Sequence, residues 1–249
     1  MDFHYYSQTF LHFYTMELPR LVEKSIPTDN FWLADLGVGD GSLLVSLKLN
    51  GYLLNSNQVF AVDISQDRCN RLKDNTDFNI LCSDVTDIPQ LESQKYDYVI
   101  CTQVIEHVDQ NKLLCEINRI LNSNGVLYIA SVIKKKYGWW YYKNDKGDWV
   151  LDPTHLREYR SKQEFENVIK SQGFDILETD VTRLKLSIIE FLIRRVFVNL
   201  FSVKKVNSLF LKYKFLDYLR KKLYINPPGY YIIETIAKKS NIVLNENIV

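Results

Sequence analysis

The sequence predicts an α/β domain of the doubly wound type, in which helices cover both faces of a mostly parallel sheet. From position 31 onward, apolar runs alternate with amphipathic helical segments. The helices are long enough to connect parallel strands by crossovers, and nearly continuous apolar strands are typical of a sheet buried on both faces. With 249 residues, 46% of them hydrophobic, the chain can bury one such core, so we expect a single domain over 1–249.

The expected elements follow one another in a regular order. The first five strands are FWLADLGV, VFAVDI, FNILCSD, YDYVICTQVI and GVLYIASVIK, and the helices between them are GSLLVSLKLN, SQDRCNRLKDN and DQNKLLCEINRIL. Another helix, SKQEFENVIKSQ, begins after a serine cap and ends at Gly173, and the strand FDILETDV follows it. After the break NPPG, a final strand is expected over 229–239.

Around the core of residues 31–182, three segments have a different character. Residues 1–30 are expected to form an N-terminal helical segment, and residues 135–160 an insertion or lid. The insertion carries an aromatic cluster that can stack on a sugar, an aromatic ring or bases, or can form a hairpin at the domain edge. The members of this cluster are Trp139, Trp140, Tyr141, Tyr142 and Trp149.

The third segment, 183–224, is expected to be a basic helical cap. The whole chain carries a formal charge of +1, yet residues 183–222 hold 11 Lys or Arg against 2 Asp or Glu. Such a segment favours an anionic partner: a phosphorylated or glycan-linked small-molecule substrate, or a membrane touched peripherally through 183–222. Its apolar residues at helical spacing are equally typical of a helical pair packed on the sheet edge or in a homodimer.

The cysteines and the N-terminus bear on the cellular compartment. Cys69, Cys82, Cys101 and Cys115 show no CxxC spacing, so we expect neither a disulfide framework nor a zinc site. The first residues lack the basic start and apolar run of a secretory signal, and charges interrupt every apolar stretch. We therefore expect a cytoplasmic protein that lies at most on the surface of a membrane.

The strongest motif, LADLGVGDG at 33–41, stands where the first strand meets a helix. Its glycines let the backbone turn tightly and bring a ligand close to the helix N-terminus. A dinucleotide fingerprint would have a third glycine at Ser42. Asp63 ends the second strand, where a carboxylate can accept both hydroxyls of a ribose, and Asp84 follows the third strand, within reach of an adenine amino group. Either aspartate alone can also be a helix cap or a loop residue, but the three features in this order predict a nucleotide site.

DLGVGDG, AVDIS, SDVTDIP and YDYVICTQVIEHV, in this order, resemble the class I S-adenosylmethionine-dependent methyltransferases. The nearest resemblance is to the branch with ubiquinone-biosynthesis and natural-product O-methyltransferases, over roughly 30–182 and the final strand. It implies a seven-stranded, Rossmann-like sheet whose last strand is antiparallel, and S-adenosyl-L-methionine as the cofactor.

The resemblance also assigns roles around that cofactor. The glycine loop would cradle its methionine part, with Asp35 supporting the loop through backbone contacts, and Gln103 would border the same part. Asp63 and Ile64 would lie at the ribose, and Asp84 and Val85 would flank the adenine. In similar enzymes, aromatic residues near the start, here Tyr5 and Tyr6, close over the cofactor. The expected cofactor-binding residues are Asp35, Gly37, Val38, Gly39, Gly41, Asp63, Ile64, Asp84, Val85 and Gln103.

Methyl transfer to oxygen also needs a base, and a histidine suits this role. His4 and His12 lie in the N-terminal segment and are expected at the surface or as caps. His107 stands at the carboxyl end of the fourth strand, and His155 follows the aromatic insertion, so both can face the cleft. Each can equally be a hydrogen-bonded structural histidine.

Together with Glu106, these two histidines form the candidate catalytic set of His155, His107 and Glu106. This set is similar to the ligands of metal-dependent small-RNA 2′-O-methyltransferases. Gln103 replaces the first acidic ligand of that pattern, and the remaining set suits a hard cation poorly, so we expect no metal.

We therefore expect O-methylation of a small molecule: a sugar, a polysaccharide precursor or a secondary metabolite. The alternatives are a quinone or lipid methyltransferase at a membrane surface, an RNA methyltransferase, and a non-catalytic protein that keeps the fold as a scaffold. No RNA-binding module is recognisable in the sequence, which makes nucleic acid an unfavoured partner. The intact glycine loop, with Asp63 and Asp84, argues against a scaffold.

Overall fold

The computed structural model describes residues 12–53, 55–139, 142–143, 147, 149–197 and 207–240. In chain order, its helices and strands are α2 (Arg20–Ser25), β1 (Leu33–Leu36), α3 (Ser42–Leu49), η1 (Ser56–Gln58), β2 (Val59–Asp63), α4 (Gln66–Asn75), β3 (Asn79–Cys82), β4 (Tyr96–Thr102), α5 (Gln110–Ile120), β5 (Leu121–Lys134), β6 (Tyr142–Lys143), β7 (Trp149–Val150), α6 (Lys162–Ser171), β8 (Phe174–Arg183), β9 (Leu186–Ser187), α7 (Ile188–Phe197), α9 (Leu209–Lys212), α10 (Lys214–Lys222), β10 (Tyr224–Ile225) and β11 (Tyr230–Lys239).

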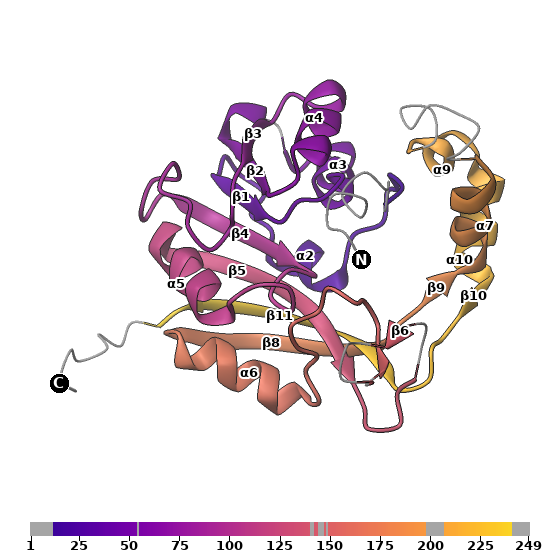
Figure 1. The fold of residues 1–249 in the computed structure, drawn as a ribbon. Helices are drawn as coiled ribbons and strands as arrows, with labels where there is room; N and C mark the ends of the chain where they lie inside the picture. The colour runs from indigo at the N-terminus through magenta and orange to yellow at the C-terminus, as the bar shows by residue number, and fades with distance from the viewer. Residues whose placement is uncertain are drawn as a thin grey trace.

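The central sheet has seven strands in the order β3-β2-β1-β4-β5-β11-β8. The pairs among β3, β2, β1, β4 and β5 are parallel, whereas β11 lies antiparallel between β5 and β8 (Figure 1). This arrangement confirms the predicted doubly wound, Rossmann-like sheet with an antiparallel last strand. The carboxyl ends of β1, β2 and β4 meet at one edge, where ligands bind in open α/β sheets.

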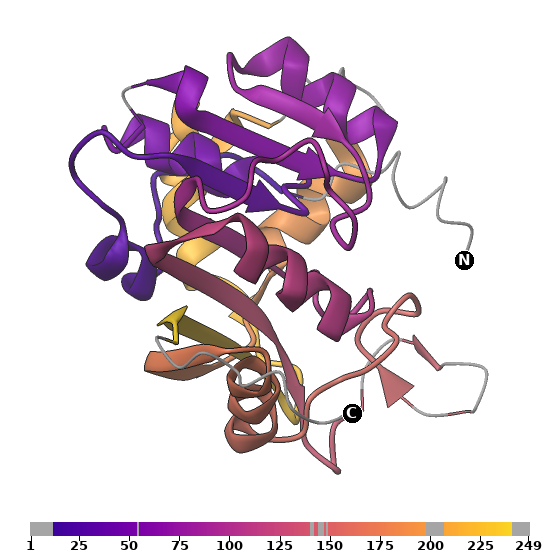
Figure 2. The same ribbon diagram turned by 90° about the vertical axis from the view of Figure 1, so that its left-hand side faces the viewer.

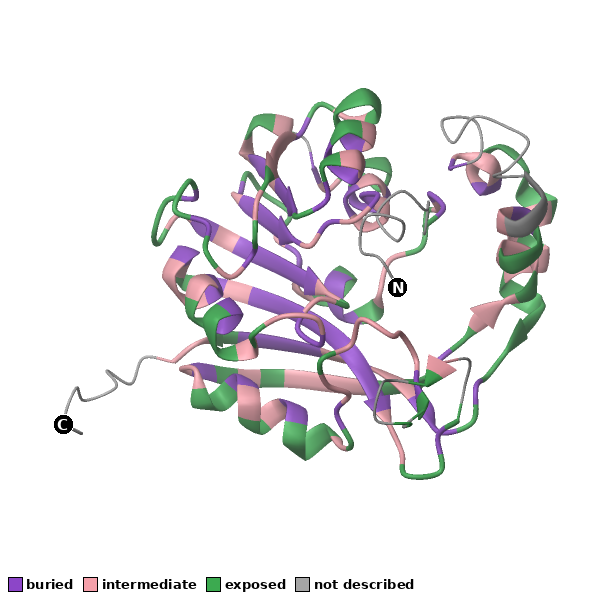
Figure 3. Cartoon of the chain, viewed as in Figure 1, coloured by how far each residue is buried: buried purple, intermediate pink, exposed green. Residues whose placement is uncertain are grey.

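Successive residues of each strand pack into two separate cores, one on each face of the sheet. In β4, Val99 and Cys101 join the core that α5 and α6 cover, while Tyr98 and Ile100 join the core beneath α2, α3 and α4. Helices lie on both sides of the sheet (Figure 2). The strands are largely buried and the outward sides of the helices are exposed (Figure 3). Burial on both faces explains why the strands are almost entirely apolar.

Two strand boundaries differ from the sequence-based expectation. β4 ends at Thr102 rather than continuing through Ile105, because Gln103 has a φ of 56° that turns the chain out of the sheet. β5 begins at Leu121, directly after α5, rather than at Gly125. Leu121 pairs with Tyr96 of β4, and the register between the two strands shifts before the next pair, Tyr98 with Val126.

The segment from 183 to 224 is less helical than expected. It begins with β9 and ends at β10, which pair antiparallel and form a two-stranded stalk. The stalk carries α7, α9 and α10 away from the sheet, at the right of Figure 1. Within the described residues, helix therefore starts at Ile188 rather than at Arg183. "The cap" below means β9, α7, α9, α10 and β10.

The insertion contains a hairpin, in which β6 pairs antiparallel with β7. Trp149 is partly exposed, and the Lys143 ammonium lies 4.9 Å from the centre of its ring. Trp140 and Tyr141 of the aromatic cluster lie outside the described residues.

Among the described residues of the N-terminal segment, α2 is the one helix, and the chain before it runs without regular structure. His4, Tyr5 and Tyr6 fall outside the described part, and His12 is exposed. Where the structure describes the chain, its helices are all too short or too polar to cross a membrane.

Candidate functional site

The glycine loop lies at the carboxyl end of β1 and is held by the neighbouring strand. The amide groups of Gly37 and Val38 donate hydrogen bonds to the carbonyl oxygen of Val62 at 2.8 and 2.9 Å. Gly37 has a φ of 78°, and a Cβ atom there would lie 2.1 Å from Cγ2 of Val104. The loop therefore needs glycine at this position.

Asp63 ends β2 and faces this loop. Its Oδ2 accepts a hydrogen bond from the Gly39 amide at 2.8 Å, and its Oδ1 accepts one from the Ser65 amide at 2.8 Å. The Asp63 carboxylate is thus buried, fixed in orientation and still able to accept further hydrogen bonds, because each carboxylate oxygen has two lone pairs.

Asp35 was expected to support the loop, but the described contacts give that role to Asp63. Oδ1 of Asp35 is buried without a hydrogen-bond partner among the described residues. Burial, with a contribution from the Asp63 charge, raises the pKa of Asp35 to about 8. An unpartnered buried carboxylate of this kind suits a cationic ligand, because a positive charge would offset the cost of its ionisation.

Asp84 and Val85 follow β3. Oδ1 of Asp84 accepts hydrogen bonds from the amide and the hydroxyl of Thr86, both at 2.8 Å. Asp84 therefore stabilises a local turn, as expected of the loop residue that was its alternative role. Val85 is buried.

A cavity of about 450 Å³ gathers these elements. A volume of this size is typical of small-molecule and cofactor sites. Six of the ten expected cofactor-binding residues line it: Gly37, Asp63, Ile64, Asp84, Val85 and Gln103. The cavity walls do not include Asp35, Val38, Gly39 or Gly41, which shape the loop behind it.

Four further residues of the wall were not expected from the sequence: Arg68, Val104, Val108 and Thr154. Arg68 lies on the first turn of α4, which Ser65 caps, and its Nη1 is 4.0 Å from Oδ2 of Asp63. The serine cap places Arg68 on that turn, a signal that could have indicated it.

His107 also lines the cavity, and two neighbours fix its tautomer. The hydroxyl of Thr154 lies 2.6 Å from Oδ1 of Asp152, to which it donates, and 3.0 Å from Nδ1 of His107. Since the single hydroxyl proton is used on the carboxylate, Thr154 accepts from Nδ1–H, and Nε2 of His107 keeps its lone pair. Burial, and next the charge of His155, lower the pKa of His107 to about 4.

His155 stands behind His107, with the two ring centres 4.7 Å apart. Its Nδ1 lies 3.1 Å from a carboxylate oxygen of Glu158. Glu106 is fully buried: one of its oxygens accepts from the Ser131 hydroxyl at 2.9 Å, and Oε1 has no partner among the described residues. Burial raises the pKa of Glu106 to about 7.

The structure therefore brings together the candidate catalytic set of Glu106, His107 and His155. One ligand atom from each lies within 4.8 Å of the other two. Two imidazoles and one carboxylate can hold a divalent transition metal, although they can also share a proton. Gln103, which replaces an acidic ligand in the metal-dependent pattern, lines the cofactor cavity instead.

A second cavity, of about 310 Å³, lies between the sheet and the cap. Thr15 and Glu17 of the N-terminal segment line it, with Glu190 and Arg220 of the cap. Gln103 borders both cavities, so the two meet at the residue whose backbone turns out of β4. An acceptor molecule in the second cavity would thus reach the cofactor cavity beside Gln103.

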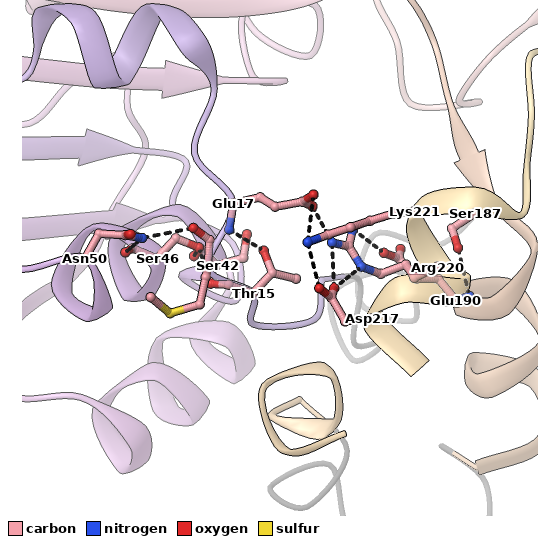
Figure 4. A network of polar contacts seen from close by, with 11 residues as sticks. Thr15, Glu17, Ser42, Ser46, Asn50, Ser187, Glu190, Asp217, Arg220 and Lys221 are labelled. Carbon is pink, nitrogen blue, oxygen red and sulfur yellow. Dashed lines mark hydrogen bonds and ion pairs between the residues drawn. The ribbon is translucent and has the colours of Figure 1, made fainter. Parts of the chain in front are cut away.

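Three residues that line this second cavity, Glu17, Glu190 and Arg220, also take part in ion pairs (Figure 4). The Arg220 guanidinium pairs with Glu17, lies 2.8 Å from Asp217 and reaches Glu190 at 3.5 Å. Lys221 lies 2.7 Å from Asp217 and 3.3 Å from Glu17. We call these five residues the latch, because they join the cap to the N-terminal segment.

The same N-terminal segment is fastened to the cofactor side. The hydroxyl of Ser46, on α3, donates to the Thr15 carbonyl oxygen at 2.8 Å, and the Asn50 amide donates to the Met16 carbonyl oxygen at 2.9 Å (Figure 4). Residues 15–17 thus connect the helix after the glycine loop to the cap.

Residues 34–129 match the protein family described as "Methyltransferase domain". This segment, 96 of the 249 residues, is therefore similar to a methyltransferase domain. The matched segment runs from β1 to β5 and includes the glycine loop, Asp63, Asp84, Glu106 and His107, whereas His155 and the cap lie beyond it. The chain is accordingly a methyltransferase enzyme, and S-adenosylmethionine is its cofactor.

Solved structures share the fold at low sequence identity. Phosphoethanolamine N-methyltransferase 2 of Haemonchus contortus, in complex with phosphomonomethylethanolamine and S-adenosylhomocysteine, is 18% identical, with a TM-score of 0.58; the match covers 89% of this chain and 51% of that one. The methyltransferase thus spans about half the length of the Haemonchus enzyme.

Two other structures show how varied the chemistry on this fold is. Geranyl diphosphate C-methyltransferase from Streptomyces coelicolor A3(2) is 12% identical, with a TM-score of 0.52 and coverage of 88% of this chain and 77% of that one. The [4+2]-cyclase SpnF is 16% identical, with a TM-score of 0.56 and coverage of 88% and 78%. None of the curated proteins matches the sequence. The fold is thus shared, and the methyl acceptor has to be inferred from the site.

Proposed function

We propose that this methyltransferase acts on an oxygen atom of a small molecule and that His107 is the catalytic base. One observation carries the proposal: His107 lines the cofactor cavity, and the contact of its Nδ1 with Thr154 leaves Nε2 as the ring nitrogen with a lone pair. A hydroxyl acceptor must lose a proton when it is methylated, so an enzyme that methylates oxygen needs a base beside the cofactor.

The residues of the cavity fit S-adenosylmethionine. Asp63 would accept the ribose hydroxyls, Asp84 and Val85 would lie at the adenine, and the loop with Gly37 would hold the methionine part. Asp35 lies behind the loop, outside the cavity wall, and its buried Oδ1 has no partner among the described residues. A cationic cofactor nearby would favour the ionised form of this carboxyl group. When bound, the cofactor supplies an activated methyl group, so the chain has only to align the acceptor and exclude water.

His107 takes the acceptor's proton on Nε2. As the imidazole becomes positively charged, its Nδ1–H bond to Thr154 strengthens, and Asp152 holds the Thr154 hydroxyl in the accepting orientation. The low pKa of His107 keeps the imidazole neutral, and therefore able to accept a proton, at neutral pH.

We assign His155 and Glu106 a positioning role beneath His107. His155 packs edge-on against the His107 ring, and its own Nδ1 is held by Glu158. With Gln103 in place of an acidic ligand, we propose that the three side chains share a proton and that the enzyme works without a metal. Activity in the presence of a chelator tests this, and activity that is lost on chelation and restored by Mg²⁺ or Mn²⁺ would overturn it.

The cavity between sheet and cap is the proposed acceptor site. Its polar wall, with Glu17, Glu190 and Arg220, suits a hydroxylated molecule such as a sugar or a polysaccharide precursor. A lipid or quinone acceptor is a second candidate, favoured by the exposed apolar side chains of the cap. That residues 1–249 form one domain, and that the enzyme is cytoplasmic, remain predictions.

Methyl-labelled S-adenosylmethionine tests the proposal with paired acceptors. Hydroxylated aromatics and nucleotide sugars would be compared with amines of the same skeleton. Transfer to the hydroxyl compounds that falls sharply in His107→Asn supports the proposal. Transfer to the amines alone, or hydroxyl transfer that His107→Asn leaves unchanged, contradicts it.

A further inference from the structure

The cap exposes large apolar side chains to solvent. Phe191 is 47% exposed and Phe215 is 69% exposed. Half of the exposed large hydrophobic side chains in the described chain belong to this region. We call them the outer face of the cap: Ile188, Phe191, Leu192, Tyr213, Phe215, Tyr218, Leu223, Tyr224 and Ile225.

Their spacing shows that each cap helix has two sides. On α7, Phe191 and Leu192 lie three and four residues after Ile188, so the three share one side of the helix, and all are exposed. The opposite side of α7, with Ile189 and Ile193, packs into a small core around Phe13 and Phe210. The inner side thus satisfies the packing of the helix, and the outer face contributes nothing to that core. Figure 3 shows how much of these helices is exposed.

The charged side chains around this face are positive. Lys185, Lys212, Lys214 and Lys222 are exposed beside the apolar side chains, and the Lys185 ammonium lies 4.9 Å from the ring centre of Tyr224. Both acidic residues of the described cap form ion pairs with other cations. Asp217 pairs with Arg220 and Lys221 (Figure 4), and Glu190 pairs with Arg194 and Arg220.

Nine large apolar side chains exposed on one small group of elements indicate an interaction site. Its charge decides between the partners. A second copy joined by a twofold axis would place the same lysines opposite one another, which is unfavourable. Nucleic acid suits the lysines but not the aliphatic side chains Ile188, Leu192 and Ile225, because nucleic-acid interfaces are polar. An anionic lipid surface accepts both, since apolar side chains enter the acyl boundary and lysines meet the headgroups.

We propose that the outer face of the cap docks on an anionic membrane surface, with Phe191 and Phe215 inserted and the lysines around them at the headgroups. The cap helices then lie in the plane of the interface, which agrees with the lack of a spanning helix in the described chain. The inner side of the same helices borders the acceptor cavity through Glu190 and Arg220, so docking brings that cavity to the membrane. The proposal concerns this surface alone and does not depend on which atom is methylated.

Vesicle co-sedimentation of the full chain tests the proposal. The vesicles would contain phosphatidylcholine with phosphatidylglycerol, and phosphatidylcholine alone would serve as the neutral surface. Each lysine near an anionic surface contributes about a fivefold increase in affinity. Lys212→Gln, Lys214→Gln and Lys222→Gln together should therefore weaken binding about 100-fold, and high salt should weaken binding of the unmodified protein likewise.

The apolar contribution is tested by Phe191→Ala with Phe215→Ala, which should weaken binding at least tenfold even at low salt. Leu49→Ala with Lys170→Gln, exposed residues on α3 and α6, is the matched control and should bind as the unmodified protein does. S-adenosylhomocysteine binding by every variant confirms that it is folded. Absence of binding to anionic vesicles, equal binding by the Phe variant and the control, or a dimer that the Phe variant abolishes would overturn the proposal.

Discussion

The Nδ1 atom of His107 lies 3.0 Å from Oγ1 of Thr154, a hydroxyl whose only proton is committed to Asp152. This contact joins residues that are 47 positions apart in the sequence, and it leaves Nε2 as the acceptor nitrogen of a histidine that lines the cofactor cavity. It distinguishes His107 from His155 and makes their roles separable by experiment.

His107→Asn should lower the turnover rate by roughly 100- to 10,000-fold, because the acceptor's proton then has no base. The affinity for S-adenosylhomocysteine should change little. His155→Asn should have the smaller effect of the two. Parallel rate and binding measurements check this, and a fully active His107→Asn beside an inactive His155→Asn would transfer the catalytic role to His155.

Thr154→Val should lower the turnover rate about tenfold, since the histidine can then adopt the other tautomer. Thr154→Ser keeps the hydroxyl and should retain most of the turnover rate. If Thr154 only filled space, the valine variant, which has nearly the same shape, should be the more active of the two. The pH–rate profiles of both variants provide the measurement. Equal turnover rates for Thr154→Val and Thr154→Ser would refute the proposal that Thr154 positions His107.

Asp35→Asn should stabilise the ligand-free enzyme in alkaline solution. The pKa of Asp35 is about 8 in the folded protein and ordinarily 3.8, so the folded state retains a proton that the unfolded state loses between these values. Stability from this group is complete below pH 4 and is lost as the pH rises to 8. The variant, which has no proton to lose, should gain on the order of 2–5 kcal/mol by pH 9.

Urea unfolding at pH 5, 7 and 9 measures that gain. Asp175→Asn, at an exposed position of β8, is the control and should show no such trend. Asp35→Asn should also bind S-adenosylhomocysteine more weakly. A stability difference that does not grow between pH 5 and 9 would exclude the proposed cost of ionising Asp35.

The local part of the site could be predicted from the sequence, because it depends on neighbours along the chain. The glycine loop, Asp63 and Asp84 each stand directly after a strand, so their meeting follows from the parallel sheet. Thr154 and Asp152 could not be predicted as partners of His107. They belong to the insertion of residues 135–160, and the sequence does not show where that insertion lies relative to the sheet. The stalk was also missed: β9 and β10 have two residues each, too few to produce a periodic pattern.

Arg220→Ala should loosen the cap. Its guanidinium joins Glu17, Asp217 and Glu190, and its loss leaves these carboxylates close together, at a cost of about 1–2 kcal/mol in unfolding free energy. Hydrogen exchange should accelerate in α7 and α10 and not in α5. Lys214→Ala, on the same helix as Arg220, is the control. Unchanged exchange in Arg220→Ala would show that the latch does not hold the cap.

The central claim is that the cavity beside Asp63 holds S-adenosylmethionine, and calorimetric titration with S-adenosylhomocysteine tests it most directly. The unmodified enzyme should bind one molecule. Asp63→Ala should bind it about 1.5–3 kcal/mol more weakly, because charged hydrogen bonds to the ribose are lost, and His107→Asn should bind as the unmodified enzyme does. Unchanged affinity in Asp63→Ala, or a preference for a nicotinamide dinucleotide, would contradict the account.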